Sequence, residues 1–168
     1  MTYNDLKSIT KQAVCHTLGA ASKDFDKWLV TCDPNDGIEI EGYDFGTCVE
    51  LSFDPSVSPF NYFSSEVVFY VSTDDLGMGN VQAFFGSSCY DVDSAEEVAN
   101  DFLDRGSEDG WFVEEYFDED SGLHLMREFE FDPKDPSDLS DKLISCFSEL
   151  CGPFISSKLR SFIHYFED

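Results

Sequence analysis

The chain has 168 residues, and its 35 acidic side chains against 10 basic ones give a net charge of −25 at pH 7. A chain this negative repels nucleic acid and anionic membranes, so its charge argues against direct binding to phosphates. No stretch approaches the roughly 18 apolar residues of a membrane span, and the N-terminus lacks a basic segment followed by an apolar run. The sequence therefore predicts a soluble, cytoplasmic protein.

Length and aromatic content predict one folded domain over residues 1–168. A chain of this length can bury about two-thirds of the surface that it exposes when unfolded. Seventeen Phe, seven Tyr and two Trp provide large apolar side chains for a single core. These side chains argue against disorder, which the charge alone would suggest.

The acidic residues are concentrated in the middle of the chain. Residues 1–32 hold three acids and four bases, and residues 142–168 hold three of each. Residues 33–141 hold 29 acids against Arg105, Arg127 and Lys134, a net charge of −26. This exceeds the ~2 to 8 charges that keep a small domain soluble. We therefore interpret the excess as a binding surface for a basic partner.

Apolar residues at three- and four-residue spacing predict a first helix over residues 4–18, which Gly19 ends. A short helical turn over residues 24–30 carries Phe25, Trp28 and Leu29 into the core. It is followed by a turn with the sequence Asp-Pro-Asn-Asp-Gly.

Alternating apolar and polar residues predict four strands in the next part of the chain. Residues 38–41 pair with residues 49–53 through a connection at residues 43–46, and the exposed face of this pair is acidic. After a loop that contains two Pro, residues 67–72 and 81–85 form two further strands. A Gly-containing turn between them closes a hairpin.

The second half of the chain begins with a capping box. Ser94 and Glu97 predict the start of a helix over residues 94–105. Residues 111–117 and 123–131 then form a hairpin with an acidic turn between them.

Two helices are expected at the C-terminal end. Ser137 or Asp138 caps the first of them, Gly152-Pro153 interrupts the helical pattern, and an amphipathic helix over residues 154–166 follows. The fold class that results is α+β, with an antiparallel sheet of about five to six strands and helices packed against it. The predicted order is one helix, four strands, one helix, two strands and two helices.

This order of elements resembles that of the type III secretion chaperone and YbjN-like superfamily. The pattern consists of a capped helix, an aromatic strand, an acidic turn with Gly, a Leu-polar-Leu strand and an amphipathic helix, at residues 94–105, 111–117, 118–122, 123–125 and 138–151. The resemblance implies a sheet with helices packed against it. It also implies a non-enzymatic acidic protein that binds other proteins, often as a homodimer.

The sequence carries no convincing catalytic motif. The six cysteines form no C-x-x-C pair, and we expect them to be reduced thiols packed in the core. Cys15 and His16 are neighbours on one helix and point to different faces, which argues against a pair of nucleophile and base. His124 is interpreted as a surface residue among acids and His164 as part of the polar side of the last helix. We expect no enzyme activity and no cofactor.

Two Gly-containing segments invite comparison with ligand-binding loops. Residues 77–80 lack the third glycine of a dinucleotide-binding loop and no helix is predicted to begin there, so we interpret them as a turn. Residues 118–122 resemble the start of a calcium loop, but Gly122 comes one position too early for the EF-hand frame. We expect no dedicated metal site, and weak Ca²⁺ or Mg²⁺ binding by adjacent carboxylates stays open.

The candidate site is a periodic display of carboxylates. Side chains two residues apart on a strand share a face at a spacing of about 6.6 Å, which is on the scale of the charge spacing in nucleic acids. Such rows could imitate phosphates. The candidate partner-binding residues are Glu39, Glu41, Asp91, Asp93, Glu96, Glu97, Asp101, Asp104, Glu114, Asp118, Glu119, Asp120, Glu128 and Glu130.

Two function classes follow. The first is a nucleic-acid mimic that blocks the basic groove of a nucleic-acid-binding protein, such as a CRISPR effector, a restriction enzyme or a nuclease toxin, with aromatic contacts from residues such as Tyr62, Phe63 and Tyr116. The second is a chaperone or adaptor that holds a client segment. The first predicts binding that weakens with salt, whereas the second predicts an exposed apolar groove and little salt dependence.

Overall fold

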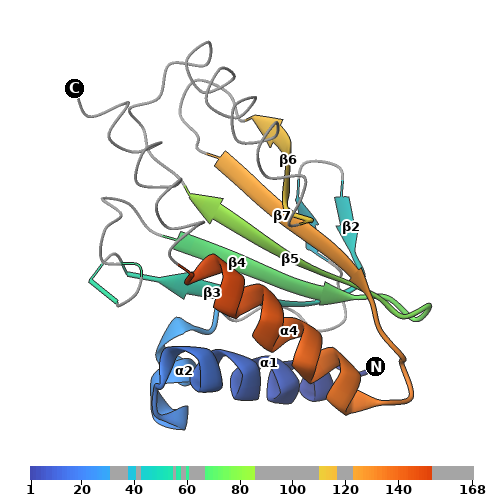
Figure 1. The fold of residues 1–168 in the computed structure, drawn as a ribbon, viewed down its shortest axis with the longest axis horizontal. Coiled ribbons are helices and arrows are strands. Elements are labelled where there is room, and N and C mark those ends of the chain that lie inside the picture. Colours follow the sequence, from blue (N-terminus) through green and yellow to red (C-terminus); the bar gives the residue numbers. More distant parts are fainter. Residues whose placement is uncertain are drawn as a thin grey trace.

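The computed structural model describes residues 1–30, 38–40, 43–54, 56, 57, 60, 67–85, 110–116 and 123–152. At residues 38–40, 43–45, 84, 85, 113–116, 123 and 124 the description covers the backbone alone. The predicted α+β class is confirmed, because an antiparallel sheet is packed against helices that lie on one side of it (Figure 1). No helix within these described ranges is long and apolar enough to cross a membrane.

The N-terminal helix α1 (Tyr3–Leu18) begins and ends where its sequence favours it. Thr2 and Asp5 form a capping box: the Thr2 hydroxyl accepts from the Asp5 amide, and the Asp5 carboxylate accepts from the Thr2 amide at 3.1 Å. Gly19 ends the helix with a φ of 61°, a left-handed conformation that glycine adopts without strain. One face of the helix is buried, with Leu6, Ile9, Thr10, Ala13 and Val14.

A second helix, α2 (Ser22–Trp28), follows α1. It begins two residues before the predicted helical turn and adds a helix to the predicted order of elements. Phe25 is fully buried and Trp28 packs against the core, as predicted. Leu29 already belongs to the sheet region, because it forms an antiparallel bridge to Leu51.

Five antiparallel strands form the main sheet, in the order β3-β4-β5-β7-β6. Their bounds are Thr47–Phe53 for β3, Val67–Thr73 for β4, Met78–Phe85 for β5, Phe112–Tyr116 for β6 and Leu123–Glu130 for β7. The predicted hairpins β4–β5 and β6–β7 are both present. β5 begins at Met78, so Gly79 and Asn80 belong to a strand and not to the predicted turn.

The first predicted strand pair is wrong. β1 (Ile38–Ile40) does not pair with the strand at residues 49–53, but with β2 (Tyr43–Phe45), which lies in the predicted connection. These two short strands form a separate two-stranded sheet, and β3 pairs with β4 instead. Alternation shows that a segment is extended and half-buried, but several partners can satisfy the same pattern. The single predicted sheet of five to six strands is therefore correct only in part.

The core lies between one face of the main sheet and the helices α1 and α4 (Pro136–Leu150). The strand register aligns Leu51, Phe69, Ala83 and Leu125 across four strands, and all four side chains are fully buried. α4 crosses this face and α1 lies beside it (Figure 1). The apolar faces of both helices are thereby removed from water, which is the main contribution to stability.

Aromatic rings connect the layers of the core. The ring centroid of Phe69 lies 5.2 Å from that of Phe53 on β3 and 5.8 Å from that of Phe147 on α4. Phe60, from the predicted loop after β3, is buried with its centroid 5.1 Å from that of Phe53. Trp28 contacts the same ring at 5.0 Å. Phe53 thus joins α2, the sheet and the loop, at the spacing that favours tilted and edge-on aromatic pairs.

The cap of α4 differs from the prediction. Asp135, and not Ser137 or Asp138, precedes the helix, and its carboxylate accepts from the Ser137 amide at 3.0 Å. Pro136 then occupies the first helical position, where a missing amide hydrogen has no consequence. Asp138 instead accepts from the amide of Asp132 at 2.8 Å. Several acceptors follow one another here, and the sequence does not show which of them keeps a non-helical backbone.

The remaining predicted elements lie outside the described residues. They are the turn at residues 33–37, the helix over residues 94–105, the hairpin turn at residues 118–122 and the helix over residues 154–166.

Gly77 joins the β4–β5 turn to the segment that follows β7. Its φ is 90°, and its carbonyl accepts from the Phe131 amide at 2.8 Å. A Cβ at this position would lie 2.5 Å from the Phe131 carbonyl oxygen and 2.9 Å from the Pro133 ring. Gly77 is therefore required both by its backbone conformation and by the close approach of the two segments.

We expect Gly77→Ala to destabilise the fold more than Gly19→Ala. Both substitutions place a Cβ on a left-handed backbone, which costs about 1–2 kcal/mol. A Cβ on Gly19 meets nothing within 4 Å, whereas the overlap at Gly77 adds roughly 1–3 kcal/mol. Urea denaturation of the two variants measures the difference. Equal losses would contradict this account of the turn.

Four of the six cysteines lie in the described residues. Cys48 and Cys146 are buried, and Cys15 and Cys151 are half-buried. Burial raises the pKa of Cys146 to about 11 and that of Cys151 to about 12. Such thiols carry little thiolate near neutral pH and are poor nucleophiles.

These thiols predict a loss of stability at alkaline pH. An unfolded Cys loses its proton near pH ~8.5, while Cys146 keeps its proton in the folded state up to about pH 11. Above the unfolded pKa the unfolded state therefore binds fewer protons, and the free energy of unfolding falls as the pH rises toward the folded pKa. Urea denaturation at several pH values between 8 and 10 measures the slope of the free energy of unfolding against pH. Cys146→Ala should make the slope shallower, and an unchanged slope would show that this thiol does not contribute.

Candidate partner-binding surface

Two of the predicted acids lie next to each other on the outer face of β7. Glu128 and Glu130 are both exposed. They point away from the helices, because Leu125 and Phe129, at the alternate positions, pack in or against the core. In the neighbouring strand they lie opposite Asn80 and Met78. This pair therefore forms a short outward row of carboxylates, which we call the β7 row.

The sequence predicted an acidic exposed face for residues 38–41 and 49–53; of its acids, Glu50 lies on the outer face of β3 and is half-buried. Cys48, Ser72, Gln82 and Met126 lie on this face and are all buried. The Ser72 hydroxyl donates to the Asn80 side-chain oxygen at 2.7 Å. Among the outer-face side chains that the structure describes in the strands, the exposed carboxylates are therefore those of Glu128 and Glu130 at the end of β7.

Glu39 and Glu114 are described by their backbone alone. Glu39 lies opposite Asp44 in the β1–β2 pair. Glu114 lies in a bulge of β6, because Val113 pairs with Leu125 while Tyr116 pairs with Leu123. Alternation does not continue through a bulge, so the row expected from Glu114 into the following turn does not follow from this register.

The other predicted acids lie outside the described residues. They are Glu41, Asp91, Asp93, Glu96, Glu97, Asp101, Asp104, Asp118, Glu119 and Asp120. The same holds for the predicted aromatic contacts Tyr62 and Phe63.

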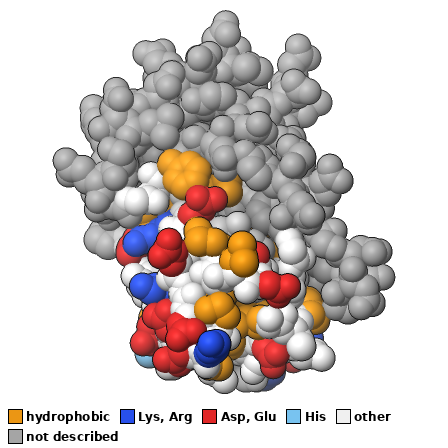
Figure 2. Space-filling model, turned by 90° about the vertical axis from the view of Figure 1, so that its right-hand side faces the viewer, with side chains coloured by type: hydrophobic (Ala, Val, Ile, Leu, Met, Phe, Trp, Pro, Cys, Tyr) orange, Lys and Arg blue, Asp and Glu red, His pale blue; other side chains and the backbone are white. Residues whose placement is uncertain are grey.

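The structure also brings together acids that the sequence prediction missed. Asp74 and Asp75 lie in the β4–β5 turn, Asp132 and Asp135 lie between β7 and α4, and all four are exposed. The backbone hydrogen bond at Gly77 joins these two segments. We call this surface, residues 74–78 and 131–136, the turn end. Figure 2 faces it and shows acidic side chains, with Lys or Arg side chains among them, interspersed with hydrophobic ones. Each segment reads as an Asp-rich turn in the sequence, but nothing in either one shows that the two meet.

Asp74 fixes the shape of the β4–β5 turn. Its carboxylate accepts from the amides of Leu76 and Met78, each at 2.9 Å, and its own amide donates to the Met78 carbonyl at 3.0 Å. The turn thus holds a defined conformation. It nevertheless exposes 87% of Leu76 and 39% of Met78, which are the exposed large hydrophobic residues of the described part of the chain.

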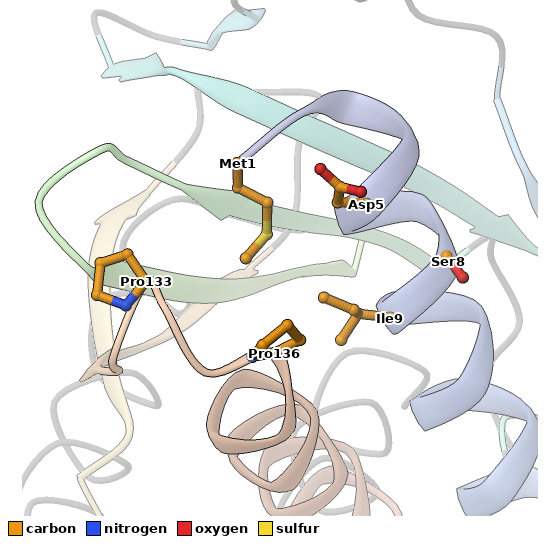
Figure 3. A pocket seen from close by; sticks show the side chains of 6 residues that line it. All are labelled: Met1, Asp5, Ser8, Ile9, Pro133 and Pro136. Carbon is orange, nitrogen blue, oxygen red and sulfur yellow. The ribbon is translucent and has the colours of Figure 1, made fainter.

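A pocket of about 240 Å³ opens beside the turn end, between the start of α1 and the segment that leads into α4 (Figure 3). The lining residues are Met1, Asp5, Ser8, Ile9, Pro133 and Pro136. The turn end borders this pocket on two sides. Gly77 lies against Pro133, and the amino terminus lies 3.8 Å from the Asp75 carboxylate.

Direct ion pairs leave most of this negative charge unbalanced. The ion pairs among the described residues are Lys11–Asp26, Lys27–Asp24, Arg127–Glu149 and the amino terminus with Asp75. Lys134 adds one basic side chain to the turn end. The carboxylates of the β7 row and of Asp74, Asp132 and Asp135 take part in none of these pairs. The two surfaces therefore present a net negative charge to solvent.

A further charged cluster at the other end of α4 holds the fold together. The Trp111 indole donates to Oε2 of Glu149 at 2.9 Å, and the Arg127 guanidinium donates to the same oxygen. Arg127 also lies over the Trp111 ring, 5.8 Å from its centroid. The Ser145 hydroxyl donates to the second Glu149 oxygen at 3.0 Å. Both carboxylate oxygens are thus occupied in attaching α4 to the sheet.

We expect Glu149→Ala to lower the free energy of unfolding by about 1–3 kcal/mol, because it leaves the Trp111 and Arg127 donors without their acceptor. Ser148→Ala, at the exposed neighbouring position, is the control and should change it by less than about 0.5 kcal/mol. Urea denaturation followed by Trp fluorescence measures both. If the two variants unfold alike, the cluster has no structural role.

Of the candidate catalytic residues, only Cys15 and His16 have described side chains. Cys15 is half-buried, and burial is the main cause that raises its pKa, while His16 is exposed. His124 is described by its backbone alone, and His164 lies outside the described residues. In the part of the chain that the structure describes, no group of three or more His, Cys, Asp or Glu residues is placed to hold a metal ion.

Comparisons of the chain with protein-family models, with curated proteins and with solved structures each found no match. The resemblance to the secretion-chaperone superfamily therefore stays a hypothesis, and the function has to be inferred from the surface itself.

Proposed function

We propose that the chain is a non-enzymatic inhibitor that occupies the basic nucleic-acid groove of another protein, with carboxylates in the place of phosphates. The observation that supports this most is the unbalanced charge. Residues 33–141 carry a net charge of −26, and the acids of this segment at the turn end and in the β7 row are exposed. Charge of this size opposes the compact state by self-repulsion. A binding role explains why the chain keeps it, since solubility needs far less.

The mechanism is competition for the groove. The summed negative charge attracts a basic protein over a long range and speeds association. At contact, carboxylates on the sheet and on the Asp74-ordered turn pair with Lys and Arg side chains that otherwise hold phosphates. Because the attraction is between exposed charges, added salt weakens it.

Three kinds of basic protein fit this mechanism: a CRISPR effector, a restriction or other nuclease, and a nuclease toxin for which the chain is the immunity protein. The alternative is a chaperone or adaptor that binds a client segment, as the resemblance implies. The pocket beside the turn end is apolar in part and would serve either role, so salt dependence separates the two.

The proposal predicts that tagged protein captures a basic nucleic-acid-binding protein from its host lysate at low salt. High salt or added DNA or RNA should release the captured protein, which mass spectrometry identifies. In a purified assay the chain should then reduce nucleic-acid binding by that protein. A neutral or acidic client that stays bound at high salt would contradict the proposal and favour the chaperone alternative.

The β7 row provides a second prediction. Glu128→Gln with Glu130→Gln should slow association with the captured protein and weaken binding by about 3- to 30-fold at low salt, because two exposed charge pairs are lost. The matched control is Asp54→Asn with Asp141→Asn, which removes the same charge from two exposed positions, after β3 and on α4, that take part in none of the ion pairs above. Surface plasmon resonance at two salt concentrations measures both variants. Equal effects would show that total charge matters and that the β7 row does not.

A further inference from the structure

We infer that the turn end and the pocket beside it form one docking surface for a basic segment that carries a large apolar side chain. This inference deepens the proposed function and rests on it for the sign of the partner's charge. It names the surface that binds and the chemistry of the contact.

The pocket has the shape and lining of a site for one side chain. Met1, Ile9, Pro133 and Pro136 make four of its six lining residues apolar. In Figure 3 the side chains of Met1, Ile9 and Pro136 converge on the space between α1 and the start of α4. Its volume of about 240 Å³ lies below the ~300–1,000 Å³ of pockets that hold a small molecule. An aliphatic or aromatic side chain is the occupant that fits this size.

Leu76 and Met78 extend the apolar contact beyond the pocket. Both are exposed at the turn, and the turn is already ordered by the carboxylate of Asp74. A contact made by an ordered turn loses little conformational entropy on binding. The exposed Leu76 side chain therefore serves as a preformed anchor next to the pocket.

Acids outnumber bases around these apolar groups. Asp5 lies in the pocket wall, and Asp132 and Asp135 lie on either side of Pro133 and Lys134 in the sequence. Asp75 is paired with the amino terminus. Hydrogen bonds from Thr2 hold the pKa of Asp5 below its usual value, so this carboxylate is ionised near neutral pH. An apolar centre within a polar, charged rim is the common anatomy of a protein interface.

The charge of the rim selects among possible occupants. Nucleic acid and anionic lipid are repelled by it. A second copy of this chain would bring the same acids face to face, because a symmetric contact places equal surfaces together. A neutral client segment would leave the rim without partners. Lys and Arg on both sides of an apolar residue satisfy the rim and the pocket together.

Three short synthetic peptides test the inference. Two of them have the same Lys and Arg content and differ in their three central residues, which are Leu-Phe-Leu in one and Ser-Gly-Ser in the other. The third peptide has Leu-Phe-Leu between neutral residues. Each is titrated into the ¹⁵N-labelled chain at physiological salt. Ser8→Trp fills the pocket from an exposed position of α1, and Gln12→Trp, one turn further on and outside the lining, is its control. Leu76→Ser removes the exposed anchor.

The basic Leu-Phe-Leu peptide should bind about 10- to 100-fold more tightly than the basic Ser-Gly-Ser peptide, as expected for one buried apolar side chain. It should also bind more tightly than the neutral peptide, which has no Lys or Arg to pair with the acidic rim. Its shift changes should centre on the amides of Ser8, Leu76 and Met78. Ser8→Trp and Leu76→Ser should each reduce the preference, while Gln12→Trp keeps it. Retention of the native spectrum by each variant excludes unfolding as the cause.

Equal binding of the two basic peptides, or an unchanged preference in both Ser8→Trp and Leu76→Ser, overturns the inference. Equal binding of the neutral peptide also overturns the inference, because it indicates a neutral client. Self-association of the chain through this surface overturns it as well, because a second copy is then the occupant. These outcomes are separate from failure of the proposed function. Salt-sensitive capture of a nucleic-acid-binding protein can persist when the docking surface is wrong, and peptide preference can persist when no such protein is captured.

Discussion

Leu51, Phe69, Ala83 and Leu125 form a continuous apolar row across four strands, and burying this row is the constraint on which the rest of the structure depends. Two amphipathic helices cover the row from the same side, α1 from the N-terminal end of the sequence and α4 from its C-terminal half (Figure 1). Because both helices pack on that face, the start of α1 lies beside the segment that leads from β7 into α4. The turn end and its pocket are a consequence of this arrangement.

The same constraint decides where the negative charge can lie. On the face under the helices the described strands carry no exposed carboxylate, and on the outer face Cys48, Ser72, Gln82 and Met126 are buried. Among the side chains that the structure describes in the sheet, the exposed acids are Glu128 and Glu130 at the end of β7, and further exposed acids lie in the turns at this end.

Several of these acids stabilise the backbone as well. Asp74 orders the β4–β5 turn, Asp135 caps α4, and Asp132 and Asp138 hold the segment between β7 and α4 through backbone amides. The carboxylates of Asp74, Asp132 and Asp135 accept from amides and remain exposed. Structural and binding roles are thus compatible in one side chain, and they reduce the conformational freedom of the surface before a partner arrives.

The sequence alone determined the α+β class, the first helix with its end at Gly19, the two hairpins and the concentration of charge in the middle of the chain. Each of these depends on local periodicity, on a cap residue or on composition, which are all properties of neighbouring residues. Only the tertiary structure decided that β1 pairs with β2, that Asp135 caps α4, and that residues 74–78 lie against residues 131–136. Several partners satisfied the same local pattern in each case, and the choice among them was made by long-range packing, such as the close approach of Gly77 to Phe131. The β7 row could be read from alternation because no bulge interrupts its strand. The turn end could not, because it is built from two segments whose contact no local pattern encodes.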